Sequence, residues 1–187
     1  MADWKKEPLS GFIEFKNGKK RPSKVGGIPV YGGNGVLGYS DSSNNENSVI
    51  IGRVGAYCGS VYYEPRPHWV SDNAISARSR ADADIVFIYY LLKSLSLNKR
   101  HIGTSQPLLT QEILNTIEVF LPPLSMQVEI GRNLQALDDR IAINTEINHH
   151  LTVMSVTESS PDIRRGKSES RICRRRRFSR WFCSKHS

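Results

Sequence analysis

The sequence predicts an α+β fold: a domain with a β-rich core, followed by a long C-terminal helix of the coiled-coil type. Short β-rich runs separated by glycine and asparagine clusters fill residues 29–63, which is typical of strands joined by tight turns. Apolar residues then recur at spacings of three and four over residues 126–154, as in a helix that packs against another helix. The predicted boundaries are 1–123 for the domain, 124–155 for a spacer or dimerisation helix, and 156–187 for a basic, disordered tail.

The β-rich region is predicted to contain short strands and glycine-rich turns. Val49–Ile51 and Ser60–Tyr63 are the strand candidates, and residues 31–35 and 42–47 are the turns between such runs. Glycines spaced through a strand pattern indicate a bulge, or a place where another stretch of backbone comes close. The glycines in question are Gly52, Gly55 and Gly59.

Two helices and one more strand are predicted after this region. Apolar residues at helical spacing over 84–97 indicate an amphipathic helix with Asp84 as its N-cap. Thr110 is the predicted N-cap of a short helix at 111–117. Ile117–Leu121 then reads as a strand that ends at two prolines.

The long helix is predicted to begin after Ser125 as its N-cap. At about 1.5 Å per residue, residues 126–154 would span roughly 43 Å, more than a small domain needs to cover itself. An apolar seam of this length usually packs against a partner helix. The residues assigned to the seam, two asparagines included, are Ile130, Leu134, Leu137, Ile141, Asn144, Ile147, Asn148 and Leu151.

Charge and cysteine content limit the possible classes of protein. Residues 158–187 hold 10 of the 26 Lys and Arg residues but 3 of the 18 Asp and Glu residues, so most of the formal net charge of +8 lies there. A charge run of this kind would bind any polyanion electrostatically, nucleic acid included, but it is more often solvated than specific. Three cysteines without ligand spacing support neither a disulfide framework nor a zinc site. No stretch is apolar enough for a membrane span, so we expect a cytoplasmic protein.

No motif predicts a reaction. Gly33–Gly38 matches the GxGxxG pattern, but a loop composition follows it in place of a helix, which favours a simple turn over a dinucleotide site. Leu121–Leu124 lacks the Asn or Asp that begins the catalytic tetrapeptide of adenine methyltransferases, and no nucleophile and base recur together. We therefore expect no catalytic residue, no metal and no cofactor.

Cations, amides and hydroxyls on the predicted loops are the candidates for DNA contact. Cations suit phosphate oxygens, whereas amides and hydroxyls suit base edges or phosphates. Each has a structural alternative: Arg53 could pair with a carboxylate, and Asn34 could occupy a left-handed turn. The candidates are Lys19, Lys20, Arg21, Tyr31, Asn34, Arg53, Asn73, Lys99, Arg100, Thr104, Ser105 and Gln106.

Three motifs follow one another in the predicted domain: Ile28–Gly35, Ile51–Gly59 and Ser71–Ala74. In this order they resemble one family, the specificity subunits of type I restriction-modification systems. Gly103–Pro107 is similar to the later part of that family's target recognition domain. Two further motifs resemble the region where that family's recognition domain joins its spacer helix. They are Leu121–Leu124 with Gln127, and Leu137–Ile141 with Asn144, Ile147 and Asn148. The resemblance covers about residues 3–154, and its specificity lies in the order of the motifs.

The resemblance implies a mixed α/β domain whose loops read one part of a split DNA site in the major groove. It also implies that modification subunits supply S-adenosylmethionine and flip the target base, and that restriction subunits join through them, so this chain would not be an enzyme. A full specificity subunit carries two recognition domains and two antiparallel helices, whereas this chain supplies one of each. We therefore expect a two-fold homodimer through the long helix and a palindromic split site.

Two other hypotheses remain open at this point. A truncated specificity fragment could act as a decoy that binds modification subunits through residues 126–154 without reading DNA. A nonspecific DNA-binding protein could instead act through its basic tail, in which case deleting residues 158–187 would abolish all DNA affinity. The loss of apolar period after Met154 would fit a change of reading frame near residue 155.

Overall fold

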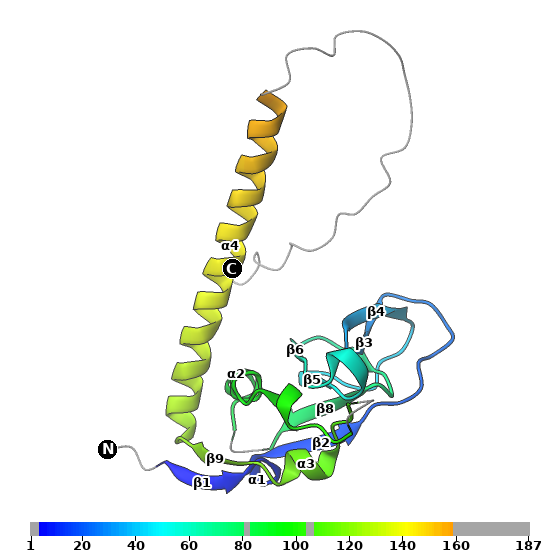
Figure 1. Ribbon diagram of the computed structural model, residues 1–187, viewed down its shortest axis with the longest axis vertical. Coiled ribbons are helices and arrows are strands. Elements are labelled where there is room, and N and C mark those ends of the chain that lie inside the picture. Colours follow the sequence, from blue (N-terminus) through cyan, green and yellow to red (C-terminus); the bar gives the residue numbers. More distant parts are fainter. Residues whose placement is uncertain (1–3, 81–82, 104–106, 159–187) are drawn as a thin grey trace, which may run out of the picture. The chain divides into compact units, whose positions relative to one another are not determined.

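The computed structural model describes residues 4–80, 83–103 and 107–158. Its first elements are β1 (Lys5–Pro8), α1 (Leu9–Phe12), β2 (Ile13–Asn17), β3 (Ile28–Gly32), β4 (Gly35–Ser40), β5 (Ser48–Gly52), the 3-10 turn η1 (Gly55–Tyr57) and β6 (Val61–Glu64). The others are β7 (Trp69–Val70), β8 (Ala74–Ser79), α2 (Ile85–Ser94), η2 (Leu97–Lys99), α3 (Gln111–Asn115), β9 (Glu118–Leu121) and α4 (Leu124–Glu158). These elements confirm the predicted α+β class and the long C-terminal helix (Figure 1).

The strands of the described residues form three small sheets. The largest is antiparallel and has the strand order β2-β8-β5-β6. The second has the order β4-β3-β7, with β3 and β7 parallel, and the third pairs β1 with β9. In the largest sheet β5 is an inner strand, and all five of its residues are buried, which explains its continuous apolar run.

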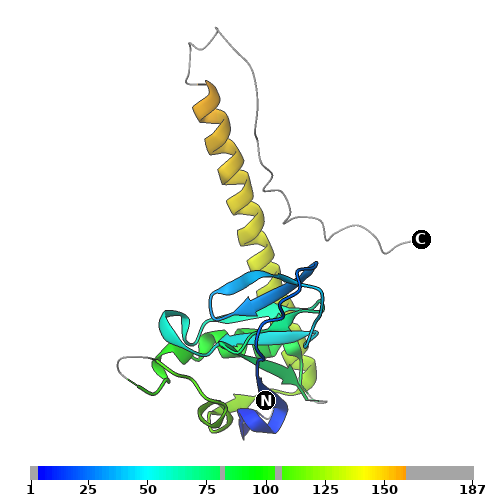
Figure 2. The same ribbon diagram turned by 90° about the vertical axis from the view of Figure 1, so that its right-hand side faces the viewer.

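The four-stranded sheet separates two hydrophobic cores. Successive side chains of a strand point to opposite faces, so Val49 and Ile51 of β5 join the core that contains Ile88 and Leu92 of α2. Ile50, between them, joins a smaller core with Tyr31 of β3 and residues of β7 and β8. The β3–β4 hairpin thus lies beside the four-stranded sheet (Figure 2), and the three helices α1, α2 and α3 contribute to the other core.

The predicted caps of the two short helices are confirmed. Asp84 precedes α2, and its carboxylate accepts a hydrogen bond from the backbone N–H of Phe87 at 2.8 Å. Thr110 precedes α3, and its hydroxyl accepts from the N–H of Ile113 at 3.3 Å. Both helices end earlier than predicted: α2 ends at Ser94 and α3 at Asn115.

The predicted start of the long helix, after Ser125, is wrong by two residues. α4 begins at Leu124, so Ser125 lies inside its first turn. The carbonyl of Pro123 accepts the N–H groups of Met126 and Gln127 at 2.9 and 3.0 Å. At its other end α4 continues to Glu158, and contacts divide the chain within this helix into the units Met1–Ile143 and Asn144–Ser187.

A buried polar cluster lies in the smaller core. Glu64 is only 3% exposed and accepts hydrogen bonds from the Tyr31 hydroxyl and from the Arg66 guanidinium, each at 2.9 Å. His68, also buried, meets the Tyr31 ring edge-on and hydrogen-bonds Ser48 at 2.9 Å. Burial alone would raise the pKa of Glu64, but the hydrogen bonds from Arg66 and Tyr31 outweigh it and hold that pKa below its ordinary value.

Glu64 is expected to make the fold sensitive to acid. Because its folded-state pKa is below the unfolded one, its stabilising effect is complete above the unfolded pKa of about 4.3 and is lost as the pH falls through the folded pKa. Glu64→Gln should lower the free energy of unfolding at pH 7 by about 1–3 kcal/mol and flatten its dependence on pH below about 5. Urea unfolding between pH 3 and 7 measures both, with Glu118→Gln, an exposed partner of Lys6, as control. Equal pH slopes for wild type and Glu64→Gln would refute this role.

Candidate nucleic-acid interface

One end of the four-stranded sheet collects most of the loops that carry candidate residues. The register pairs Gly52 of β5 with Ala74 of β8, and Ile51 with Val61 of β6. At the same end, Asn17 of β2 pairs with Ile75. The connections that follow β2 and β5 and precede β6 and β8 therefore start here, and we call this region the loop end.

Glycines allow the loops at this end to touch through their backbones. A Cβ atom on Gly52 would clash with the carbonyl of Tyr57 and would lie 3.1 Å from the Cα of Gly33, in the turn between β3 and β4. A Cβ on Gly33 would lie 3.7 Å from the carbonyl of Asn73. The three domain motifs, separated by about 20 residues each in the sequence, thus meet at one place, as the glycine spacing had predicted for Gly52.

Arg53 lies at the centre of the loop end, and hydrogen bonds fix its backbone on both sides. Its N–H donates to the carbonyl of Asn73 at 3.0 Å, and its carbonyl accepts from the N–H of Leu109 at 2.9 Å. The side chain is half-buried, its Nε is covered, and no described residue accepts a hydrogen bond from it or forms an ion pair with it. Among the described residues no carboxylate lies within ion-pair distance of Arg53. Its charge makes only a minor contribution to the lowered pKa of Glu112, after the hydrogen bonds of that carboxylate with its own backbone and with Thr110.

The loop after η2 reaches the same region. Val54 bridges to Leu108, and the N–H of Gly55 donates to the carbonyl of Pro107 at 3.1 Å. Leu108 also exchanges two hydrogen bonds of 2.9 Å with Ile102, which closes the base of this loop. The candidates Thr104, Ser105 and Gln106 lie outside the described residues.

Gly59 brings η2 against the loop end. Its φ of +84° lies in the region that side chains rarely adopt, and a Cβ there would clash with the backbone of Leu97 and Asn98. This contact places η2 beside the β5–β6 connection. Lys99 and Arg100, at the end of η2, are exposed, and Nε of Arg100 donates to the carbonyl of Leu95 at 3.3 Å. The close approach predicted from the glycine spacing is confirmed here as well.

Gly59→Ala is expected to disturb this contact. Both the positive φ and the backbone clash oppose a Cβ, so the free energy of unfolding should fall by about 2 kcal/mol or more. Displacing η2 would also move Lys99 and Arg100, so DNA affinity should fall further than the lost stability explains. Thermal unfolding and DNA binding well below the melting temperature separate the two effects, with Gly27→Ala, where a Cβ meets nothing within 4 Å, as control. A variant as stable as wild type would show that this packing is dispensable.

Asn34 and Asn73 are exposed at the tips of two adjoining turns. Gly33 and Asn34 form the turn between β3 and β4, and the left-handed residue is Gly35, with φ +78°, not Asn34. The alternative of a left-handed Asn34 is therefore wrong, because the glycine takes that conformation. No helix follows this GxGxxG match, in agreement with a simple turn.

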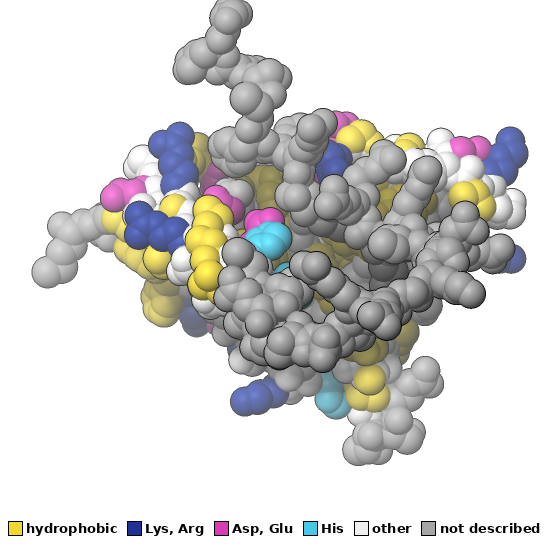
Figure 3. All heavy atoms as spheres, turned by 90° about the horizontal axis from the view of Figure 1, so that it is seen from above, with side chains coloured by type: hydrophobic (Ala, Val, Ile, Leu, Met, Phe, Trp, Pro, Cys, Tyr) yellow, Lys and Arg dark blue, Asp and Glu magenta, His cyan; other side chains and the backbone are white. Residues whose placement is uncertain are grey.

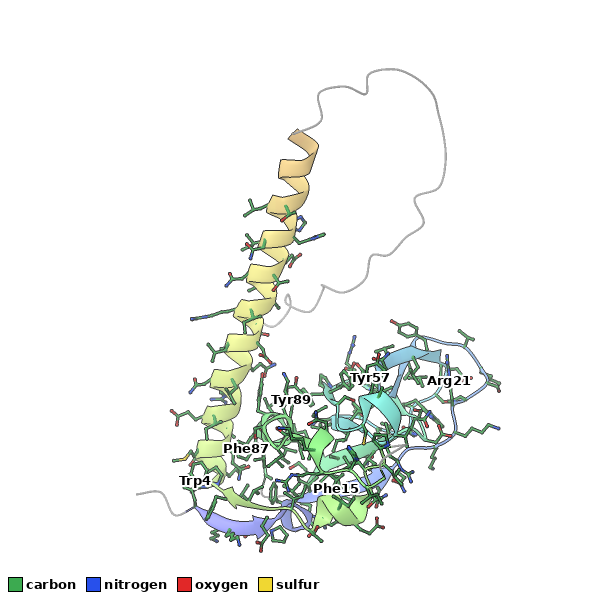
Figure 4. The ribbon with its side chains drawn as sticks, viewed as in Figure 1. Trp4, Phe15, Arg21, Tyr57, Phe87 and Tyr89 are labelled. Atoms are coloured by element: carbon green, nitrogen blue, oxygen red, sulfur yellow. The ribbon has the colours of Figure 1, made fainter. Side chains whose placement is uncertain are left out.

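The cations before β3 divide into two places. Lys19 bridges to Ser71, and its N–H donates to the carbonyl of Val70 at 3.0 Å, so it lies beside the 71–73 turn of the loop end. Arg21 instead lies against β4, where its Nη1 is 3.5 Å from the carbonyl of Leu37 (Figure 4). All three cations, Lys20 included, are exposed. Figure 3 shows Lys and Arg side chains interspersed with hydrophobic ones on the visible described surface.

Two aromatic residues change the predicted set. Tyr31 is only 8% exposed, and its hydroxyl is engaged by Glu64. This corrects the expectation that Tyr31 enters a groove, because the alternation of β3 turns its side chain into the smaller core. Tyr57, which sequence reasoning missed, is 51% exposed on η1, and its Cβ lies 3.6 Å from where a Gly33 Cβ would be (Figure 4). The position of Tyr57 between Gly55 and Gly59 was the feature of the sequence that could have identified it as a candidate.

The seam residues of α4 expose apolar surface. Leu137, Ile147 and Leu151 are 53%, 50% and 59% exposed, and Asn144 and Asn148 are exposed too. Ile141 is 62% exposed, whereas Ile130 and Leu134 are half-buried. Within the described ranges, no helix is long and apolar enough to cross a bilayer, and no group of three His, Cys, Asp or Glu residues could hold a metal ion.

The fold is that of the S subunits of type I restriction-modification systems. The crystal structure of such a subunit from M. genitalium matches with a TM-score of 0.68 and 21% identity, over 80% of this chain and 44% of that one. The HsdS subunit from Thermoanaerobacter tengcongensis matches with a TM-score of 0.58 and 19% identity, over 77% and 39%. At these identities the likeness establishes the fold.

The chain belongs to the type I restriction modification DNA specificity domain family, whose model matches residues 1–153. It is 27% identical over 121 residues to the type I restriction enzyme EcoprrI specificity subunit of Escherichia coli, covering 64% of this chain and 30% of that protein. It is 25% identical over 145 residues to a putative specificity subunit of Haemophilus influenzae, covering 73% and 37%. The chain thus matches about a third of the length of these relatives.

Proposed function

We propose that this chain carries a recognition domain of a specificity subunit, reads one element of a split DNA site, and directs adenine methylation and cleavage by partner subunits. The observation that carries the proposal is the convergence of the family motifs at the loop end. There Asn34, Arg53 and Asn73 lie on touching turns, and Lys19, Lys99 and Arg100 lie beside them. In DNA recognition, cationic side chains usually bind the phosphates and position the protein, whereas polar side chains between them contact the base edges and read the sequence.

The proposed contact set follows from this geometry. Lys19, Lys20, Arg21, Lys99 and Arg100 would bind phosphates, because each is exposed and cationic. Asn34, Arg53 and Asn73 would meet base edges, and Tyr57 would add an exposed aromatic face at their centre. Tyr31 is left out because it is buried, and Thr104, Ser105 and Gln106 stay in the set from sequence alone.

The partners follow from the family and from α4. The relatives are specificity subunits of restriction enzymes, so modification subunits, and restriction subunits through them, are the proposed protein partners. The exposed seam on α4 supports a two-fold homodimer in which two α4 helices pack antiparallel and two recognition domains face two half-sites. The proposed division remains 1–123 for recognition, 124–155 for the spacer and 156–187 for the tail.

Selection from a random duplex DNA library tests the proposal. The full chain is co-purified with its modification subunit, and bound DNA is sequenced over several rounds at about 150 mM salt, where phosphate contacts alone are weakened. Enrichment of one split motif is the expected result. Stable complex formation without any enriched motif would favour the decoy hypothesis. Loss of all binding on deletion of residues 158–187 would favour a nonspecific protein acting through its tail.

A further inference from the structure

α4 is attached to the recognition domain at two levels, and the first lies at its base. Gln127 is only 1% exposed; its Oε1 accepts from the N–H of Asp84 at 3.0 Å, and its Nε2 donates to the carbonyl of Pro122 at 2.8 Å. At Gly131 a Cβ would lie 3.2 Å from the backbone N of Phe87, so the helix backbone lies directly on the first turn of α2. These contacts hold one point of α4 firmly.

The second level is polar and lies about three turns beyond Gln127 along α4. The Tyr90 hydroxyl donates to Oδ2 of Asp138 at 3.0 Å, and Lys93 Nζ lies 3.8 Å from the same oxygen. Lys93 Nζ is also 5.0 Å from the centre of the Tyr89 ring, and Figure 4 shows Tyr89 on α2. Burial and the hydrogen bond to Asp138 raise the pKa of Tyr90, so its hydroxyl remains a donor at neutral pH.

We infer that Tyr90, Lys93 and Asp138, the α2–α4 clamp, position the spacer helix and thereby set the number of base pairs between the two half-sites. This inference rests on the proposed function. The clamp and Gln127 are eleven residues apart, about 16 Å along a helix. A helix held only at Gln127 can pivot, and a second point of attachment at that distance restricts the pivot.

A small displacement of α4 at the α2–α4 clamp produces a larger displacement at the far end of the helix. A shift of about 1 Å at Asp138 tilts the helix by roughly 4° and moves Leu151, about 36 Å from Gln127 along the helix, by more than about 2 Å. In a two-fold dimer both halves contribute, so the total displacement between the recognition domains is comparable to the rise of about 3.4 Å per base pair. The clamp is thus placed to distinguish spacings that differ by one base pair.

Stability does not account for the clamp. The Lys93 and Asp138 side chains are 50% and 46% exposed, and exposed ion pairs are worth about 0–1 kcal/mol. The domain already holds α2 through Phe87, Ile88 and Leu92, all buried. Removing the clamp is therefore expected to change the geometry of DNA reading more than the folding of the domain.

Spacing discrimination in the full complex tests the inference. Plasmids carrying the two half-sites at the native spacing and at one and two base pairs more or fewer are methylated by the chain with its modification subunit. Tyr90→Phe and Asp138→Ala should reduce the preference for the native spacing about 3- to 10-fold, while methylation at that spacing stays within about twofold; losing up to 1 kcal/mol corresponds to about fivefold. Asp139→Ala, the neighbouring carboxylate, is the matched control. An unchanged preference, or an equal loss at every spacing, would overturn the inference.

A distance measurement keeps the inference separate from the proposed function. Spin labels are placed at Ser43 and at His149, an exposed residue of α4 outside the seam, in a full chain that keeps the buried Cys58 and has Cys173 and Cys183 replaced by serine. The labelled chain is diluted with unlabelled chain so that one labelled protomer is observed. Asp138→Ala should broaden the distribution of label distances, whereas Asp139→Ala should leave it unchanged. If wild type methylates no DNA, the proposed function fails; if Asp138→Ala leaves the distribution as narrow as in wild type, the clamp fails.

Discussion

Replacing Arg53 with alanine is expected to lower methylation at the native site by about 10- to 100-fold. A polar side chain that meets a base edge contributes about 1–3 kcal/mol of discrimination. The fold should be nearly unaffected, because no described residue accepts a hydrogen bond from the Arg53 guanidinium or pairs with it as an ion, and its Nε is covered without a partner. Methylation of a plasmid carrying the site, at fixed concentration of the complex, measures the effect.

The control for Arg53 removes the same charge elsewhere. Arg132 is exposed on α4, and Arg132→Ala should leave methylation within about twofold of wild type. Arg53→Lys keeps the positive charge but loses the planar guanidinium, which can donate two parallel hydrogen bonds to a base edge. It should therefore recover only the part of the DNA affinity that comes from attraction to phosphates. Full activity in Arg53→Ala would exclude this residue from DNA reading and would leave Lys19, Lys99 and Arg100 as the cationic candidates of the loop end.

Replacing Leu137 with aspartate is expected to separate the dimer and abolish specific methylation. Leu137 is 53% exposed in the single chain, so a partner helix can bury it. Burying a leucine side chain fully stabilises an association by about 1.5–3 kcal/mol. In a two-fold dimer each protomer carries the substitution, so two leucines are lost and two aspartate charges are buried in the interface. The dissociation constant of the dimer should therefore rise by about 100-fold or more. Light scattering after size-exclusion chromatography, over a range of concentrations, measures the change of mass.

A matched variant places the same charge on the outer face of the helix. Ala136 precedes Leu137, is exposed and lies off the seam. Ala136→Asp should dimerise and methylate like wild type. A monomeric wild-type chain that nevertheless methylates a split site with its modification subunit would contradict the homodimer, and Leu137→Asp would then have no effect on activity.

Local sequence signals predicted the elements that local physics determines. Asp84 and Thr110 are caps whose side chains bond the first turn of the following helix, and both are visible in the sequence. The apolar run at Val49–Ile51 predicted a buried strand, which is β5. The start of α4 was misplaced because a serine is a good cap, whereas the chain uses the carbonyl of Pro123.

Long-range contacts account for what the sequence did not predict. The strand Lys5–Pro8 carries two lysines and a proline, so nothing in its pattern indicated that it pairs with Glu118–Leu121. Tyr31 lies in a glycine-rich stretch typical of an exposed turn, but the partner that buries its hydroxyl, Glu64, is 33 residues away. Tyr57 became a candidate only when Gly33 and Gly52 brought two loops together. The order of motifs predicted the family, and the fold determined which residues meet.

Adenine-methylation mapping by single-molecule sequencing tests the central claim most directly. The full chain is expressed with a type I modification subunit from the same source in a host that lacks DNA methylation, and the host without the chain serves as the control. The proposal predicts one split motif with two palindromic elements and a spacer of fixed length. An asymmetric motif would contradict the homodimer, and no motif despite a stable complex would contradict DNA reading by this chain.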